Sequence, residues 1–155
     1  MTLVTSLNIL VICTANICRS PAVCMMLQDA LSTKNVKVSS AGILALNGNK
    51  AADTMRKLLV ERGLHQIEDH RSQALMPHHL SQADLIFCME HEHVARVLQM
   101  NPVLKGKVKL MGHFENQSEV SDPYGHAEPV YEKSIEQMQR LTTQWVDKMQ
   151  QMGLV

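Results

Sequence analysis

Apolar residues in this chain occur in short continuous runs, separated by longer segments in which they recur with a helical period. Leu7–Ile12 is the first run, and its β-branched residues are typical of a strand buried on both faces, as in a parallel sheet. Val36–Ser39, Asp84–Met89 and Val108–Met111 predict three further strands.

The segments between these runs predict helices. A helix is expected from Ser20-Pro21 to about Ser32, because serine can cap a helix and proline fits its first position. Ala51–Gly63 carries one apolar stripe and ends at a glycine, which favours a helix C-terminus. Glu90–Met100 and a stretch from about Val130 to Gln151 predict two more helices.

The alternation of strands and helices predicts an α/β fold: a single domain over residues 1–155, with a four-stranded parallel sheet flanked by helices. A chain of 155 residues can bury about two-thirds of its unfolded surface in one core. No internal repeat, low-complexity tract or interdomain linker interrupts the pattern, so we expect one domain.

Composition narrows the classes of partner. The chain has 15 basic and 15 acidic residues and is 3% aromatic, so neither charge nor base-stacking side chains indicate a nucleic-acid partner. No apolar stretch is long enough for a membrane span, and the first dozen residues lack the Lys or Arg of a signal peptide. We therefore expect a cytoplasmic protein without stable membrane insertion.

The segment after the first predicted strand combines a cysteine with a nearby arginine: Cys13-Thr14-Ala15-Asn16-Ile17-Cys18-Arg19-Ser20-Pro21. In α/β sheets, ligands bind beyond the carboxyl ends of strands, and here backbone N–H groups also converge at a helix start. Arg19 adds a planar fork for two phosphate oxygens, and the same positive field favours a thiolate at Cys13. The segment predicts a phosphate-binding loop with a nucleophile at its floor.

Asp122-Pro123-Tyr124 can supply the acid that such a nucleophile needs. The leaving group departs opposite the attacking sulfur, so its acid must come from a separate loop, and Pro123 would stiffen that loop. Together the two segments predict a cysteine-dependent phosphatase. The alternatives are a structural Cys13 with Arg19 on the surface, and an Asp122-Pro123 that only opens a turn.

The other cysteines and the histidines do not indicate a metal site. Cys13, Cys18 and Cys24 cluster within twelve residues, which suits a reducing compartment with a reactive thiol better than a disulfide framework. Neither a Cys-x-x-Cys nor a His-x-x-x-His pair occurs, so we expect neither metal nor cofactor. Cys24 and Cys88 are expected to be packing residues.

On these motifs the chain resembles the low-molecular-weight protein tyrosine phosphatases. Their N-terminal signature, V-C-x-G-N-x-C-R-S-P, resembles Ile12–Pro21, and their acid loop, D-P-Y/F, is matched by Asp122–Tyr124. Further matches keep the family's order over almost the whole chain: Ser39-Ser40-Ala41-Gly42, Asp69-His70-Arg71-Ser72 and Asp84–Met89.

The resemblance implies hydrolysis of phosphotyrosine through a cysteinyl-phosphate intermediate. It implies Cys13 as nucleophile, Arg19 as phosphate clamp, and Asp122 as general acid and then base. The phosphate-binding residues would be Thr14, Ala15, Asn16, Ile17, Cys18 and Arg19. The loop would be supported by Asn16, Ser20, Ser40 and His70. The walls of the substrate pocket would be Thr14, Leu46 and Tyr124. Cys18 would form a reversible disulfide with Cys13, or simply pack under the loop.

Some features are similar to the bacterial exopolysaccharide or capsule branch of the family. They are Leu46, the segment Gly106–Phe114, and Gly125 in place of a second tyrosine that is common in animal members. The resemblance implies a partner that carries phosphotyrosine, namely a bacterial tyrosine autokinase.

Ala15 departs from the family, which has glycine at this position. If the position needs a left-handed backbone, alanine costs about 1 kcal/mol there, and Ala15→Gly is expected to raise activity. Two other functions stay open. One is an arsenate reductase, which needs further cysteines although Cys88 alone lies in the 80–95 region. The other is a catalytically weak phospho-binding module, which Ala15 favours.

Overall fold

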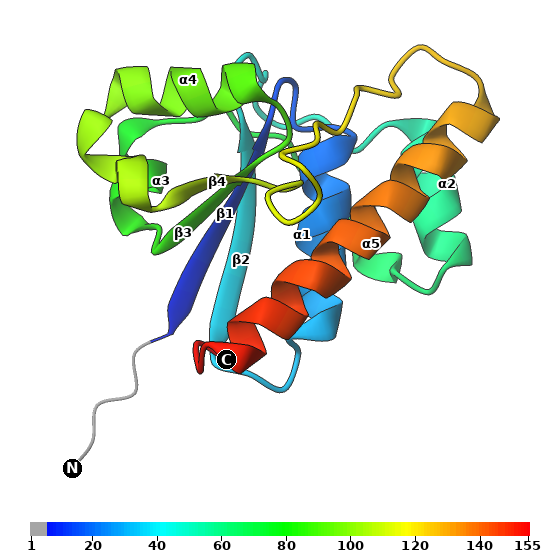
Figure 1. The fold of residues 1–155 in the computed structure, drawn as a ribbon. Coiled ribbons are helices and arrows are strands. Elements are labelled where there is room, and N and C mark those ends of the chain that lie inside the picture. Colours follow the sequence, from blue (N-terminus) through cyan, green and yellow to red (C-terminus); the bar gives the residue numbers. More distant parts are fainter. Residues whose placement is uncertain (1–5) are drawn as a thin grey trace.

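The sheet has the strand order β2-β1-β3-β4, and all of its strand pairs are parallel. The computed structural model describes residues 6–155, so residues 1–5 of the predicted domain lie outside the described part. Figure 1 shows its strands, which are β1 (Leu7–Cys13), β2 (Val36–Gly42), β3 (Leu85–Cys88) and β4 (Val108–Leu110). The predicted α/β fold with a four-stranded parallel sheet is confirmed.

Helices cover both faces of the sheet (Figure 1). One face packs against α1 (Arg19–Ala30), α2 (Asp53–Glu61) and α5 (Glu128–Gln151). The other face packs against α3 (Pro77–Gln82) and α4 (His91–Met100). The helical layers on both sides are the reason that the central strands β1 and β3 are almost continuously apolar, whereas the edge strands β2 and β4 keep a polar residue at every second position.

Successive residues of β1 divide between the two cores. Ile9 and Val11 belong to the core under α1 and α5, whereas Leu10 and Ile12 belong to the core under α3 and α4. All four side chains are at most 1% exposed. The continuous apolar run at the start of the chain is therefore a central strand with both faces buried.

The loop after β1 lies where the chain changes direction across the sheet. β2 is the neighbour of β1 on one side and β3 on the other, which places this loop at the switch point where α/β proteins bind ligands. The register pairs Cys13 with Gly42, and a Cβ at Gly42 would lie 2.5 Å from Thr14 O. Glycine is required there because β2 passes so close to the loop.

Some element boundaries differ from those that the sequence predicts. Three short helices were not predicted, because five or six residues carry too little pattern: η1 (His65–Asp69), α3 and η2 (Pro102–Gly106). β2 extends to Gly42, beyond the predicted strand Val36–Ser39. The expectation that Ser20 caps the first helix is wrong, because α1 begins at Arg19 and the Ser20 hydroxyl is turned into the preceding loop.

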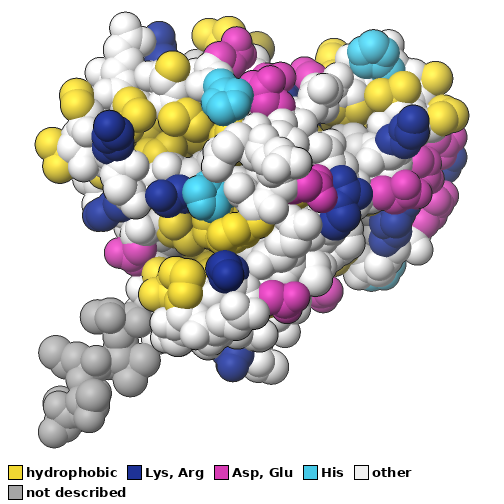
Figure 2. Space-filling view, in the orientation of Figure 1, with side chains coloured by type: hydrophobic (Ala, Val, Ile, Leu, Met, Phe, Trp, Pro, Cys, Tyr) yellow, Lys and Arg dark blue, Asp and Glu magenta, His cyan; other side chains and the backbone are white. Residues whose placement is uncertain are grey.

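Side chains of both charges are interspersed on the face drawn in Figure 2. Two ion pairs link α2 and its C-terminal end to α5: Lys57 Nζ lies 3.0 Å from Glu128 Oε1, and Arg62 pairs with Glu132. Exposed pairs of this kind contribute little to stability, because water and salt screen the two charges. Within residues 6–155, no helix has both the length and the apolar character needed to cross a membrane.

Candidate active site

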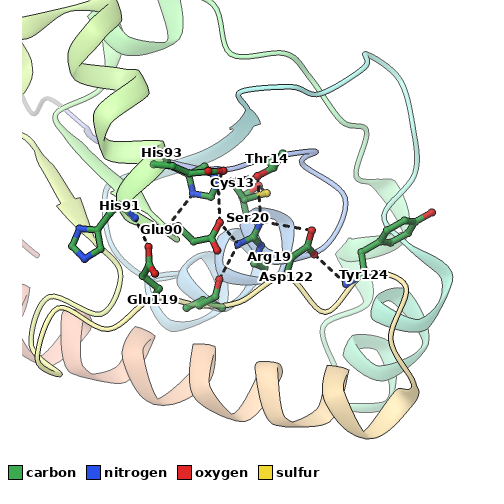
Figure 3. Close-up of polar contacts among 12 residues, drawn as sticks. Cys13, Thr14, Arg19, Ser20, Glu90, His91, His93, Glu119, Asp122 and Tyr124 are labelled. Atoms are coloured by element: carbon green, nitrogen blue, oxygen red, sulfur yellow. Dashed lines mark hydrogen bonds and ion pairs between the residues drawn. The ribbon is translucent and has the colours of Figure 1, made fainter.

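Cys13 ends β1 and Arg19 begins α1, so the loop between them joins the sheet to the first helix. Both residues are 2% exposed. A cavity of about 110 Å³ lies at this loop, lined by Cys13, Ala15, Ile17, Cys18, Arg19, Asp122 and Tyr124. Figure 3 shows the Asp122 carboxylate directed toward Arg19 from a segment much later in the chain, with Tyr124 beside it and its ring extending away from Arg19.

Asn16 holds the loop from inside. Its backbone is left-handed, with φ of 58°, and its side chain is fully buried. Its Nδ2 donates to Ser20 Oγ at 2.7 Å and to Ser40 Oγ at 2.9 Å. Its Oδ1 accepts from the Gln73 backbone N–H at 2.9 Å. His70 Nε2 donates to the Asn16 carbonyl at 2.7 Å, so the four residues expected to support the loop lie in one network.

Ser20 directs a hydrogen-bond donor at the cysteine. Its Oγ lies 2.9 Å from Cys13 Sγ. Because the same oxygen accepts from Asn16 Nδ2, its own hydrogen is free to point at the sulfur. A thiolate at Cys13 would therefore be stabilised by a hydroxyl donor and by the N-terminal end of α1.

The Arg19 guanidinium is buried among oxygen atoms. Its Nη1 donates to the Val120 carbonyl at 2.8 Å and pairs with Glu90 Oε2 at 3.1 Å. Its Nη2 lies 3.4 Å from Thr14 Oγ1 and 3.8 Å from Asp122 Oδ2. Figure 3 shows the two carboxylates approaching from two sides, which offsets the cost of burying a cation.

Glu90 is a site residue that the sequence reasoning missed. It directly follows β3 and the loop residue Met89, so it stands at the carboxyl end of the sheet beside the Cys13 loop. An acidic residue in this position, after a buried strand, was the signal that could have identified it.

Asp122 lies on the rim of the cavity, with its side chain 48% exposed. Its Oδ1 accepts from the Tyr124 backbone N–H at 3.1 Å, a contact that fixes the turn around Pro123. The Val120 N–H donates to the Met89 carbonyl at 2.9 Å and anchors this loop to the end of β3. The acid candidate is thus held by a loop that is tied to the sheet.

The other cysteines are buried thiols. Burial, followed by the negative charge of Asp122, raises the pKa of Cys18 to about 12. Burial likewise raises the pKa of Cys88, which is 0% exposed in β3. A rigid core cysteine of this kind does not fit the mobile relay that an arsenate reductase needs. Cys18 lines the cavity beside Cys13, and both are free thiols in this structure.

Of the three residues expected to form the walls of the substrate pocket, only one lines the cavity. Tyr124 lines the cavity and is 60% exposed. Leu46 is 74% exposed and does not line this cavity. The Thr14 hydroxyl is bonded to His93 Nε2 at 2.9 Å instead of lining it. Ile17, which was expected only to bind phosphate, supplies an apolar wall.

The backbone of Ala15 is not left-handed, although the glycine that the family has at this position suggested that it could be. The left-handed residue of the loop is Asn16, at φ 58°, and asparagine tolerates that conformation. The reasoning that Ala15 strains the loop is therefore wrong. Its side chain instead lines the cavity.

In residues 6–155, one group of three side chains has ligand atoms close enough to approach a metal ion: Glu90, Glu92 and His93. Glu90 is paired with Arg19, and both ring nitrogens of His93 are in hydrogen bonds. Because these ligand atoms are already held in an ion pair and in hydrogen bonds, the group does not fit a metal site.

Comparison with known proteins places this geometry in a family. The low molecular weight phosphotyrosine protein phosphatase family matches residues 8–153. AmsI of Erwinia amylovora, named a probable low molecular weight protein-tyrosine-phosphatase, is 36% identical over 90% of this chain and 95% of its own. Wzb of Escherichia coli K12, named a low molecular weight protein-tyrosine-phosphatase, is 36% identical over 89% of this chain and 92% of its own.

Solved structures agree with the sequence matches. The crystal structure of E. amylovora AmsI superposes with a TM-score of 0.87 at 35% identity, covering 93% of each chain. The YwlE arginine phosphatase of Geobacillus stearothermophilus superposes with a TM-score of 0.88 at 28% identity, covering 96% of each chain. The chain therefore belongs to the low molecular weight phosphotyrosine protein phosphatase family.

Proposed function

We propose that the protein hydrolyses phosphotyrosine in protein substrates through a cysteinyl-phosphate intermediate. The observation that carries the proposal is one cavity lined by Cys13, Arg19 and Asp122. These side chains are the nucleophile, the phosphate clamp and the acid of such a reaction. Family membership supports the same chemistry.

In the first step, the Cys13 thiolate attacks phosphorus in line and the bond from phosphorus to the tyrosine oxygen breaks. Asp122 gives its proton to that oxygen as it leaves. Arg19 Nη1 is already engaged by Val120 O and Glu90, whereas Nη2 has only longer contacts, with Thr14 Oγ1 and Asp122 Oδ2. The Nε–Nη2 edge is therefore the one that takes two phosphate oxygens. The loop N–H groups bind the other phosphate oxygen, as at other helix N-termini.

In the second step, Asp122 takes a proton from a water molecule, and this water attacks the phosphorus of the cysteinyl-phosphate. The S–P bond breaks, orthophosphate leaves, and the sulfur returns to a thiolate. The Ser20 hydroxyl, 2.9 Å from Cys13 Sγ, stabilises the departing thiolate. Asn16, Ser40 and His70 hold the loop in place during both steps.

Phosphoarginine is the second candidate substrate, because an arginine phosphatase has the same fold at a TM-score of 0.88. The cavity favours tyrosine. Ile17 and Tyr124 give it apolar sides against which a phenyl ring can pack, whereas a guanidinium would be desolvated there. A phosphotyrosine peptide should therefore be turned over faster than the matched phosphoarginine peptide.

The physiological partner in this proposal is a phosphotyrosine protein, namely a bacterial tyrosine autokinase in the cytoplasm. Support comes from the resemblance to the exopolysaccharide branch and from four free cysteines, which suit a reducing compartment. Under peroxide, Cys13 would be oxidised to a sulfenic acid, and the Cys18 thiol would displace water from it to form a disulfide that protects the nucleophile from further oxidation.

The test is metal-free hydrolysis of p-nitrophenyl phosphate and of a phosphotyrosine peptide, with EDTA present. Cys13→Ser should abolish turnover, while Cys24→Ser, a change at another buried cysteine, should retain it. Asp122→Ala should reduce kcat about 10²–10⁴-fold, whereas Asp147→Ala on the exposed side of α5 should not. Absence of turnover in the parent protein would reject the proposal.

A further inference from the structure

His93 makes a second connection between α4 and the catalytic loop (Figure 3). Its side chain is 0% exposed and lies in the first turn of α4. The Glu90 backbone N–H donates to its Nδ1 at 3.0 Å, and its Nε2 lies 2.9 Å from Thr14 Oγ1. One ring nitrogen therefore faces the helix start and the other faces the loop.

These contacts fix the tautomer of the ring. A nitrogen that accepts a hydrogen bond carries no proton, so the proton of the neutral ring is on Nε2 and is donated to Thr14 Oγ1. Burial, followed by the positive charge of Arg19, lowers the pKa of His93 to about 4. Three carboxylates oppose this shift without cancelling it: Glu92, Glu119 and Asp122.

Because the ring is neutral near pH 7, its short distances to acidic side chains are not ion pairs. Its Nε2 lies 3.7 Å from Glu90 Oε2 and 3.9 Å from Glu92 Oε1. The hydrogen bond to Thr14 is shorter than either and takes the Nε2 proton. The ring thus acts toward the loop as a neutral donor.

Thr14 connects His93 to Arg19, the proposed phosphate clamp. Its Oγ1 accepts from His93 Nε2 and also lies 3.4 Å from Arg19 Nη2. Glu90 holds Arg19 Nη1 at 3.1 Å. The start of α4 therefore restrains both terminal nitrogens of the Arg19 fork, one through a carboxylate and the other through His93 and Thr14.

We propose that His93 is a positioning residue, which as an Nε2–H donor holds Thr14 so that Arg19 presents its Nε–Nη2 edge to two phosphate oxygens. This role rests on the proposed function of the loop. It is separate from the capping of α4, which uses Nδ1 alone. His93 transfers no proton in either chemical step.

Two substitutions separate the two contacts of the ring. In His93→Asn, the amide oxygen replaces Nδ1 and keeps the bond from Glu90 N–H, but the distal donor is lost. In His93→Gln, the distal amide nitrogen replaces Nε2, but the proximal acceptor is lost. Thr14→Val removes the hydroxyl at nearly constant volume. The matched control is His79, whose Nδ1 accepts from the Met76 N–H at 2.9 Å at the start of α3.

We expect His93→Asn and Thr14→Val each to lower kcat/KM for p-nitrophenyl phosphate about 5–10-fold and to raise the Ki of orthophosphate by a similar factor. The double variant should lose no more than either single variant, because both changes break one chain of contacts. His93→Gln should stay within about threefold of the parent in kcat/KM but melt at a lower temperature. His79→Asn should leave kcat/KM within about twofold of the parent.

A folded His93→Asn with parental kcat/KM and Ki would overturn the role of His93, and so would multiplicative losses in the double variant. An inactive parent protein would instead remove the proposed function on which the role rests. If His93→Asn does not fold, the kinetics of Thr14→Val and the tautomer of the His93 ring test the proposal instead. Long-range 15N–1H spectra of histidine-labelled protein should show the His93 proton on Nε2, and a proton on Nδ1 would contradict the proposal.

Discussion

Glu90 Oε2 lies 3.1 Å from Nη1 of Arg19 and ties the start of α4 to the phosphate loop. The arginine is 2% exposed and the glutamate 26%, so the pair is largely shielded from water. Glu90→Ala leaves this buried nitrogen with the Val120 carbonyl alone. We expect a free energy of unfolding lower by about 1–3 kcal/mol. We also expect kcat/KM to fall about tenfold, because the clamp is less well positioned.

Urea denaturation and p-nitrophenyl phosphate kinetics measure the two effects of Glu90→Ala. The matched control is Glu92→Ala, which removes a carboxylate two residues away that is 68% exposed. Exposed charges contribute little, so this control should change the free energy of unfolding by less than about 0.5 kcal/mol. Equal free energies of unfolding for the two variants would show that the pair between Glu90 and Arg19 does not stabilise the fold.

Ser20→Ala tests the donor to the nucleophile. The Ser20 hydroxyl lies 2.9 Å from Cys13 Sγ, and in the proposed mechanism it stabilises the thiolate that leaves in the second step. We expect kcat to fall roughly 10²–10³-fold, as when a donor to developing negative charge is removed. Cysteinyl-phosphate should accumulate and appear as a burst in rapid-mixing kinetics. Ser39→Ala, at an exposed serine of β2, serves as control, and a Ser20→Ala variant as fast as this control would exclude the role.

Asn16 combines a left-handed backbone with four contacts, and two substitutions distinguish these contributions. Asn16→Gly keeps the backbone conformation but removes the bonds to Ser20, Ser40 and the Gln73 N–H. We expect it to lower the free energy of unfolding by about 2–3 kcal/mol. Asn16→Ala should cost about 1 kcal/mol more, because alanine resists a φ of 58°.

Asn116 offers the matched control for this pair of substitutions. It is also left-handed, at φ 55°, but it is exposed. Asn116→Gly should be nearly neutral, and Asn116→Ala should cost about 1 kcal/mol for the backbone alone. Thermal or urea denaturation of the four variants measures these values. A parental stability for Asn16→Gly would mean that the side-chain network contributes nothing.

Ala15→Gly tests whether the alanine limits activity. The structure gives no backbone reason for a gain, since Ala15 is not left-handed. We expect kcat within about twofold of the parent. Stability should be lower by up to about 1 kcal/mol, because glycine has more conformational freedom to lose on folding. A large rise in kcat would instead support the expectation from the sequence that Ala15 limits activity.

The buried His93 and the half-buried His70 make stability depend on pH. Burial lowers the pKa of His70, and that of His93 to about 4, whereas unfolded histidine titrates near about 6.5. As the pH falls below the unfolded value, the unfolded state gains protons that the folded state does not, so the folded state is destabilised until the pH reaches the folded pKa. The contribution of His93 is therefore present above about pH 6.5 and is lost toward about pH 4.

Replacement of His93 should accordingly flatten the pH dependence. Urea denaturation between about pH 4.5 and 7.5 should give a shallower slope for His93→Asn than for the parent, because the titrating ring is gone. His126→Asn, at an exposed histidine of the acid loop, should keep the parental slope. A parental slope in His93→Asn would mean that the ring is not held neutral in the folded protein.

Several features of the fold were predictable because they depend on local patterns. β1 is a continuous apolar run, and Gly63, which is left-handed at φ 87°, follows the end of α2. Boundaries were less predictable where small buried residues replace large apolar ones. Ser40, Ala41 and Gly42 extend β2 because they pack beside the loop, not because they carry a strand pattern.

The roles of individual loop residues depended on conformation rather than on residue type. A missing glycine pointed to Ala15 as a strained position, yet the left-handed residue is the next one, Asn16. Serine is a common residue type at a helix N-cap, yet the Ser20 hydroxyl contacts Cys13 Sγ instead. Backbone angles and hydrogen-bond directions decide such roles, and neither can be read from a single position in the sequence.

The α/β class and the candidate loop follow from local sequence patterns, because Cys13 and Arg19 lie within one short strand-to-helix connection. The residues that surround this loop depend on how distant segments pack together. The contact between His93 and Thr14 joins residues 79 positions apart, and Glu90 reaches Arg19 across the same boundary between α4 and the loop. Such contacts depend on the register of β1 with β3 and on where α4 begins, and both are products of the whole packed core.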